Sequence, residues 1–332
     1  MKEQDIRPTS IMDEYIRLSL LDTEKYFAGT VLEPLACVAC HSKNTKSAFQ
    51  KGGFNYENCQ DCGSLYLSPR PSLESFVRFY SESESSHYWA HEFFPAVAEK
   101  RRELIFKPRA TRVAQMMKSR GITPKRVTEV GAGFAIFLEE LKPHVSSDCE
   151  LIAIEPGQEL AEVCREKGFE TIALPVEEVK NAPLSDLVCC FEVIEHVHDP
   201  IQFLKSLFEL VRPGGLLITT GLGVDGFDIQ TLWQNSKSIS PPHHINFASV
   251  KGFEKLYARA GFSEISVETP GKLDVDIVLN YYKDKKEAPP AFLSLLKERG
   301  PEALQAFQDF LVSQRMSSHT WISALRPETE PI

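Results

Sequence analysis

The chain has 332 residues, 42% of them hydrophobic and 25% charged, which is the composition of a globular protein with one large core and a smaller module. Its formal net charge of -9 argues against a nucleic-acid partner, because phosphate binding requires a positively charged face. No apolar run approaches the roughly 20 residues that span a bilayer, and we expect neither a membrane segment nor a signal peptide. Eight cysteines in such a chain predict a cytoplasmic protein whose thiols are free or bind metal.

The first 30 residues predict an amphipathic helix. Ile11, Tyr15, Leu18 and Leu21 recur at helical spacing, so one face is apolar. We expect this helix to cap the small domain, which we place at residues 1–70.

Two Cys-x-x-Cys pairs follow. Cys37 and Cys40 are separated by 18 residues from Cys59 and Cys62, which is the pattern of a four-cysteine zinc ribbon. Four thiolates fill a tetrahedral site and leave no position for water, so the predicted zinc is structural. Two redox motifs are the alternative, but the sequence lacks the βαβ context of a thioredoxin.

Residues 71–120 predict a helical linker or lid, in which Tyr88 is a candidate for closing over a substrate. The segment 100–126 is rich in basic residues. We favour a solvated helix face, and the alternative is a patch that steers an anionic substrate. Its members are Lys100, Arg101, Arg102, Lys107, Arg109, Arg112, Lys118, Arg120, Lys125 and Arg126.

From residue 121 to 332 the pattern alternates between strands and helices. Strands are predicted at 127–130, 151–154, 169–173, 186–191, 216–220, 262–268 and 319–325. Helices are predicted at 134–142, 157–167, 200–211 and 249–260. Near-continuous apolar strands separated by helices predict an α/β fold with a doubly wound, mostly parallel, seven-stranded, Rossmann-like sheet. A helical insertion at 270–317, with helices near 290–299 and 301–315, precedes a last antiparallel strand.

The turn after the first strand of this sheet carries Gly131 and Gly133, which suits a nucleotide ligand. A dinucleotide motif would require glycine where Ile136 stands. Glu129 would repel a pyrophosphate and attract a cationic ligand, and Glu155 ends the second strand, where a carboxylate can accept both ribose hydroxyls. An adenosine end and a cationic amino-acid end describe S-adenosylmethionine (SAM).

Four motifs in residues 125–270, E-V-G-A-G, A-I-E-P, F-E-V-I-E-H-V-x-D-P and R-P-G-G-L-L-I-T-T, resemble those of class I SAM-dependent methyltransferases. The resemblance implies this fold, methyltransferase activity and SAM as cofactor. Ala135 departs from the pattern, because many members have a third glycine there, and we expect little effect. The cofactor-binding residues that the resemblance implies are Glu129, Gly131, Ala132, Gly133, Glu155, Pro156, Val176, Glu177, Phe191 and Glu192.

The cysteine pairs followed by C-G-x-L-Y-L-x-P-R-P resemble the zinc module of sugar C-methyltransferases. Those enzymes carry a further C-terminal domain and a Tyr-x-Glu-His run, whereas here the run is Pro241-Pro242-His243-His244, so only His244 corresponds. The resemblance favours a small-molecule acceptor, with a sugar or nucleotide-sugar first. An RNA or protein methyltransferase that uses the ribbon for recognition, and a quinone or phenol O-methyltransferase, are the alternatives.

A general base is required only if the methyl acceptor carries a proton. His243 and His244 follow the fifth strand and are the candidates, and the alternative is that they fix the loop by hydrogen bonding. Glu192, Glu195 and His196 could hold a divalent cation, as in quinone-pathway enzymes that the chain resembles; otherwise Glu195 caps backbone amides and His196 packs. The acceptor atom and the oligomeric state are left open.

Overall fold

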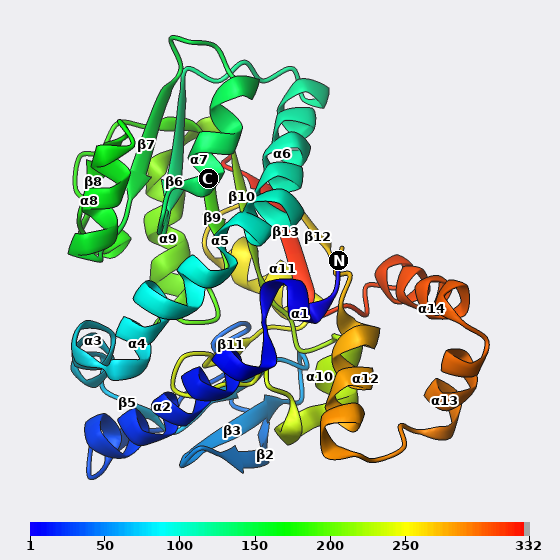
Figure 1. The fold of residues 1–332 in the computed structure, drawn as a ribbon. Helices are drawn as coiled ribbons and strands as arrows, with labels where there is room; N and C mark the ends of the chain where they lie inside the picture. The colour runs from blue at the N-terminus through cyan, green and yellow to red at the C-terminus, as the bar shows by residue number, and fades with distance from the viewer. Residues whose placement is uncertain (329–332) are drawn as a thin grey trace. The chain divides into compact units, whose positions relative to one another are not determined.

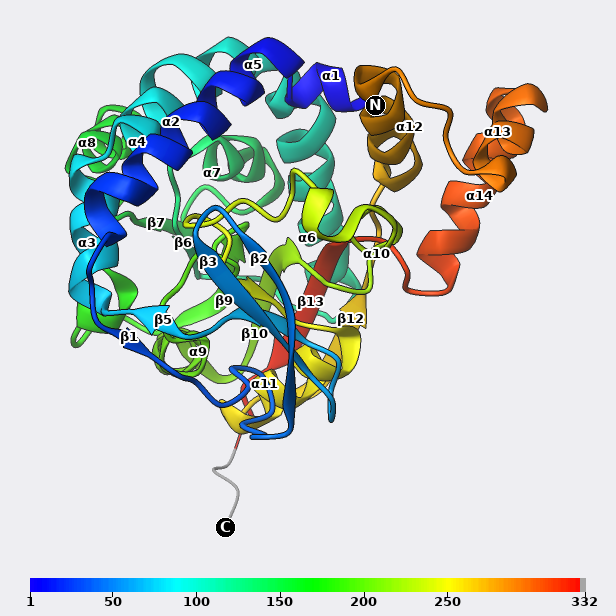
Figure 2. The same cartoon turned by 90° about the horizontal axis from the view of Figure 1, so that it is seen from below.

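The computed structural model describes residues 1–328. The chain forms two compact units (Figures 1 and 2). The first unit comprises Met1–Phe93, Gly221–Phe253 and Val267–Trp321, and the second comprises Phe94–Thr220, Glu254–Ser266 and the described residues from Ile322 to Glu328. Within residues 1–328, no helix has the length and apolar character needed to cross a membrane.

A seven-stranded sheet, most of whose residues belong to the second unit, has the strand order β12-β13-β10-β9-β6-β7-β8. The strands are β6 Arg126–Val130, β7 Glu150–Ile154, β8 Glu170–Ile172, β9 Ser185–Phe191, β10 Val211–Leu222, β12 Ser263–Glu268 and β13 His319–Leu325. The pairs β6–β7, β6–β9, β7–β8 and β9–β10 are parallel. Gly214 pairs with Arg326 and Gly223 with Ser318, so β13 runs opposite to β10. The predicted mostly parallel, seven-stranded fold is confirmed.

Helices cover both faces of this sheet, as near-continuous apolar strands require. In Figure 2, α6 and α7 lie over one face and α9 over the other. The helices of the second unit are α5 Phe94–Arg101, η2 Arg102–Phe106, α6 Lys107–Ser119, α7 Ile136–Leu141, η3 Lys142–His144, α8 Gln158–Glu166, η4 Val176–Glu178, α9 Pro200–Leu210 and most of α11 Val250–Arg259. Chain order reverses between β6 and β9, and ligands of such sheets bind at the carboxyl ends of the strands beside this reversal.

The first unit contains a four-stranded antiparallel sheet in the order β11-β4-β3-β2, and a short pair, β1 with β5. The strands are β1 Leu32–Glu33, β2 Thr45–Lys51, β3 Phe54–Cys59, β4 Leu65–Leu67, β5 Arg70–Pro71 and β11 Asn246–Phe247. β11 lies outside the predicted segment 1–70. One hydrophobic cluster accordingly combines residues 26–79 with residues 222–247, including Tyr56, Leu65, Ile245 and Phe247.

The helices of the first unit are α1 Glu3–Ile6, α2 Thr9–Phe27, α3 Leu73–Glu82, α4 Glu84–Tyr88, η1 Trp89–Phe93, α10 Phe227–Leu232, η5 Trp233–Asn235, α12 Asp274–Lys285, α13 Ala291–Glu298 and α14 Pro301–Ser313. Sequence reasoning missed α12, because its first residues, Asp-Val-Asp-Ile-Val, alternate like a strand. The buried carboxylate of Asp274 accepts hydrogen bonds from the side chains of Gln308 and Ser317 and from the amide of Ser318, which ties the start of α12 to α14 and β13.

Candidate functional site

The glycine turn joins β6 to α7. The amide of Gly131 donates to the carbonyl of Ile154, the last residue of β7, at 2.8 Å. Gly131 has a φ of 71°, and a Cβ there would lie 2.6 Å from a methyl carbon of Val193. Gly133 has a φ of 53°, with open space where a Cβ would be. The first glycine is therefore required by packing and by backbone conformation, and the second by conformation alone.

Two buried carboxyl groups flank this turn. Glu155 follows β7, and its two oxygens accept the amides of Gly133 at 2.8 Å and Gly157 at 2.9 Å. Burial raises the pKa of Glu155, although both amides favour its charged form. Glu129 in β6 is only 3% exposed, and within residues 1–328 its Oε2 has no hydrogen-bond partner. Burial raises the pKa of Glu129 well above its ordinary value, against the opposing charge of Arg109.

Arg109 of α6 brings a buried positive charge to the same site. It is 7% exposed, and its Nη2 lies 3.3 Å from Oε1 of Glu192. Its guanidinium also lies over the ring of Phe191, 4.4 Å from the centroid. Burial lowers the pKa of Arg109, while the charges of Glu192 and Glu129 oppose this effect. A buried guanidinium thus lies among residues that were predicted to bind the cofactor.

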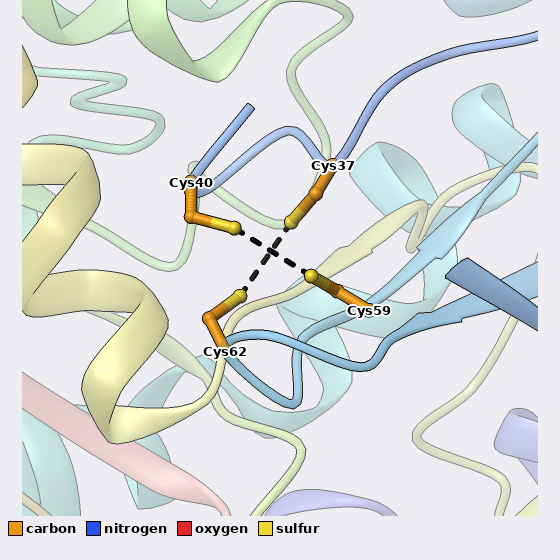
Figure 3. A group of neighbouring side chains, drawn as sticks. All are labelled: Cys37, Cys40, Cys59 and Cys62. Carbon is orange, nitrogen blue, oxygen red and sulfur yellow. Dashed lines mark hydrogen bonds between the residues drawn. The ribbon is translucent and has the colours of Figure 1, made fainter. Parts of the chain in front are cut away.

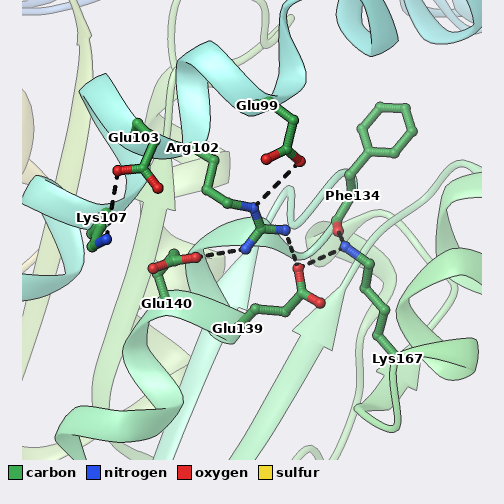
Figure 4. A network of polar contacts seen from close by, with 8 residues as sticks. All are labelled: Glu99, Arg102, Glu103, Lys107, Phe134, Glu139, Glu140 and Lys167. Carbon is green, nitrogen blue, oxygen red and sulfur yellow. Dashed lines mark hydrogen bonds and ion pairs between the residues drawn. The ribbon is translucent and has the colours of Figure 1, made fainter.

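Arg102 fastens the helical segment before β6 to the helix that follows the glycine turn (Figure 4). Its guanidinium pairs with Glu140 at 2.6 Å and with Glu139 at 2.7 Å, both on α7. Lys167 also reaches Glu139, at 2.8 Å, and donates to the carbonyl of Phe134 in the turn itself. This network holds the turn and α7 in place.

For Arg109 the expected solvated face is wrong, because its side chain is buried, and Arg102 is partly buried in its ion pairs with α7. The sequence carried a signal for Arg109. It precedes Val113 and Met117 by four and eight residues, and both are buried on α6. This spacing places Arg109 on the buried face of the helix.

Glu192 stands at the end of β9 with a φ of 56°, a left-handed conformation that is strained for a residue with a side chain. Its Oε1 accepts a hydrogen bond from the hydroxyl of Thr220 at 2.6 Å, besides the ion pair with Arg109. Within residues 1–328, the ligand atoms of Glu192, Glu195 and His196 do not gather within 4.8 Å of one another. A cation held by all three residues together is therefore not supported, whereas Glu195 and His196 do belong to a group whose ligand atoms lie close enough to hold a metal ion, and their role stays a prediction.

The other predicted cofactor-binding residues lie just after the strands or at their ends in the second unit. Ala132 and Phe191 are buried, and Pro156 is exposed. Val176 and Glu177 form the turn η4 after β8; Val176 is buried, and burial raises the pKa of Glu177. Because carboxyl ends of neighbouring parallel strands meet at one sheet edge, these residues are candidates for lining a single ligand.

The four cysteines of the two Cys-x-x-Cys pairs converge in the first unit (Figure 3). The Sγ atoms of Cys37 and Cys62 are 3.5 Å apart, as are those of Cys40 and Cys59, and all four lie within 4.8 Å of one another. Zinc–sulfur bonds of about 2.3 Å in a tetrahedron would separate the sulfurs by about 3.8 Å. The thiol set therefore fits a tetrahedral metal ion.

His243 is enclosed in the first unit. It is 3% exposed, and its ring centroid lies 4.9 Å from that of Tyr15 and 4.8 Å from that of Phe79. Its Nε2 is 3.3 Å from the hydroxyl of Ser85. Burial, with the charge of His244, lowers the pKa of His243 to about 3. These contacts favour the alternative in which His243 fixes its loop.

His244 is less buried, and its Nδ1 lies 2.6 Å from the carbonyl oxygen of Ser238. Because a carbonyl only accepts, Nδ1 carries the proton, and Nε2 is the nitrogen that can take up another. The third catalytic candidate, Tyr88, ends α4 and is partly exposed, and burial raises its pKa. The catalytic roles of His243, His244 and Tyr88 stay predictions.

Residues 97–267, just over half of the chain, match the family described as "Methyltransferase domain". The chain belongs to this methyltransferase family. The predicted methyltransferase enzyme is thereby confirmed at the level of the family.

Curated relatives of this methyltransferase include two proteins named Ubiquinone biosynthesis O-methyltransferase. The one from Vibrio vulnificus is 32% identical over 108 residues, covering 30% of this chain and 45% of that protein. The one from Proteus mirabilis is 32% identical over 104 residues, covering 29% of this chain and 41% of that protein. The chain thus spans less than half the length of these relatives.

Among solved structures, the plantazolicin methyltransferase BpumL in complex with SAH has a TM-score of 0.50 to this methyltransferase. The two are 12% identical, over 76% of this chain and 94% of that chain. This likeness concerns the fold alone, and agrees with the seven-stranded sheet.

Proposed function

We propose that this methyltransferase binds SAM at the carboxyl ends of β6, β7 and β9. The observation that carries the proposal is the buried Oε2 of Glu129, which has no hydrogen-bond partner within residues 1–328. A buried polar atom without a partner is unfavourable by about 1–3 kcal/mol. The ammonium group of a bound amino acid would satisfy this oxygen and favour its charged form.

The second unit contains residues that could bind each of the two ends of SAM. The amino-acid end carries an ammonium and a carboxylate, and Glu129 and Arg109 supply the opposite charges. Glu155 has two oxygens that each accept one amide and retain a lone pair for a ribose hydroxyl. SAM supplies an electrophilic methyl group on a sulfonium.

Calorimetric titration with SAM tests this assignment. We expect Glu129→Gln to weaken SAM binding about tenfold to a hundredfold, because the amide cannot neutralise an ammonium. Glu150→Gln is the matched control, since Glu150 begins β7 at the opposite end and pairs with Arg126. Equal affinities of Glu129→Gln and Glu150→Gln would contradict the role of Glu129.

We propose that the methyl acceptor is a small molecule, and a sugar or nucleotide-sugar is our first candidate. The resemblance of the cysteine module to that of sugar C-methyltransferases supports it. The second candidate is O-methylation of a phenol, which the curated relatives favour over about 30% of the chain. A screen of nucleotide sugars and catechols with ¹³C-methyl SAM distinguishes the two, because C-methyl and O-methyl carbons have different chemical shifts.

If the acceptor loses a proton, His244 is our candidate for the group that takes it up, through Nε2. Tyr88 is the candidate for closing over the acceptor. His244→Ala should then lose turnover and keep its affinity for SAM. Turnover equal to that of the unaltered chain would leave His244 with a purely structural role.

We also propose that the four-cysteine cluster holds a structural zinc ion. Its thiol donors and their spacing support this, and Cys37, Cys40, Cys59 and Cys62 would fill all four positions. Elemental analysis of purified protein should find about one zinc per chain. A metal-free, folded protein would overturn the proposal.

A further inference from the structure

A half-open cavity of about 240 Å³ lies in the first unit, bordered by α2, the turn between β2 and β3, and the loop at 237–241. Its apolar lining includes Ile16 and Leu20 of α2 and Ile239 and Pro241 of the loop. Pockets for drug-sized ligands have volumes of about 300–1,000 Å³, so this cavity suits a smaller organic molecule.

Lys51, the last residue of β2, brings a positive charge to this cavity. Within residues 1–328 its Nζ makes one hydrogen bond, to the carbonyl oxygen of Ser236 at 2.6 Å, and no ion pair. Burial lowers the pKa of Lys51 to about 8, and no carboxylate counteracts this effect. A desolvated ammonium without a counter-ion is unfavourable, and an anionic ligand would relieve it.

The two other charged residues of the cavity neutralise each other. Lys237 pairs with Asp13 at 2.8 Å, so Lys51 is left as the uncompensated charge. A single ammonium beside apolar walls suits a monoanion with an apolar tail better than a phosphate, which prefers several donors.

We propose that this cavity binds a small organic monocarboxylate, whose carboxylate pairs with Lys51 and whose apolar tail lies between α2 and the loop at 239–241. The site is distinct from the residues proposed for SAM, which all belong to the second unit.

The test is calorimetric titration of the full chain with hexanoate, acetate and hexanol. Hexanoate should bind at least tenfold more tightly than acetate or hexanol, because it alone offers both charge and tail. Lys51→Gln should weaken hexanoate binding at least tenfold. Lys46→Gln is the matched control, since Lys46 is exposed on the same strand, and it should leave binding unchanged. Leu20→Ala should weaken binding of hexanoate and not of acetate.

The unaltered chain offers a measurement that does not depend on the folding of a variant. Between pH 7 and pH 9.5 its affinity for hexanoate should fall at least about tenfold as Lys51 loses its proton, while binding of hexanol stays constant. Failure of hexanoate to bind, equal affinity in Lys51→Gln, equal loss in Lys46→Gln, or a pH-independent affinity would each overturn the proposal.

Discussion

The two units build their candidate sites in different ways. In the second unit, Glu129, Gly131 and Gly133 lie within five residues, and Glu155 ends the next strand. In the first unit, the cysteine cluster depends on distant residues, since Ser249 donates to the carbonyl of Cys62. A site made by contiguous motifs can be found in a sequence. The four cysteines could be found in the same way, but not the hydrogen bond from Ser249, which lies almost 190 positions away in the sequence.

The largest expected effect concerns the proposed zinc. Cys59→Ser should release the metal and lower the unfolding free energy of the first unit by more than about 4 kcal/mol, because structural zinc binding contributes about 10–16 kcal/mol in small domains. Cys149→Ser is the control, and should retain zinc and change stability by less than about 0.5 kcal/mol. Zinc content and chemical denaturation measure both. If Cys59→Ser kept its zinc and stability, the first unit would not depend on the cluster.

The two glycines of the turn should differ from each other. In Gly131→Ala the new Cβ would lie 2.6 Å from a methyl carbon of Val193, at a φ of 71°. We therefore expect the unfolding free energy to fall by about 2–4 kcal/mol and SAM binding to be lost. In Gly133→Ala the new Cβ would lie in open space, and only the left-handed backbone conformation is unfavourable for alanine. We expect the unfolding free energy to fall by about 1 kcal/mol. Denaturation and titration of both variants test this order. Equal losses would mean that packing against Val193 is unimportant.

How much could be predicted depends, in both units, on how close the interacting residues lie in the sequence. The seven strands of the sheet, the glycine turn and the position of Glu155 at the end of a strand followed from local patterns. Arg109 was misjudged, because its partner Glu192 is 83 residues away and nine other basic residues surround it in the sequence. β11 was missed because two residues cannot form a recognisable strand pattern, and their pairing with β4 depends on tertiary contacts.

A buried carboxyl pair gives the first unit a pH dependence. Asp228 is fully buried, and burial together with the charge of Asp274 raises its pKa to about 8. A carboxyl group whose pKa is higher in the folded chain than in the unfolded chain, where it is near 4, binds its proton more tightly when the chain is folded. The stabilisation that results is complete below pH 4 and is lost as the pH rises to about 8. The unfolding free energy should therefore fall by a few kcal/mol between pH 5 and pH 8 in the unaltered chain, and by less in Asp228→Asn. Parallel pH profiles of the two proteins would refute this.

The smallest expected effect lies beside the glycine turn. Ala135 has a φ of 52° and is fully buried. Since the left-handed region disfavours alanine, Ala135→Gly should raise the unfolding free energy by about 1 kcal/mol. The same change should leave SAM binding within about twofold, in line with the little effect expected from the sequence. A destabilised Ala135→Gly variant would show that the alanine methyl group contributes more by packing.

The central claim is that the turn between β6 and α7, with Glu155, binds SAM. Calorimetric titration of SAM into the unaltered chain and into Glu155→Ala tests it most directly. We predict one SAM per chain for the unaltered protein, and at least about a hundredfold weaker binding for Glu155→Ala, which loses the carboxylate that orders the turn. No binding to the unaltered chain, or equal affinity in a folded Glu155→Ala, would contradict the assignment.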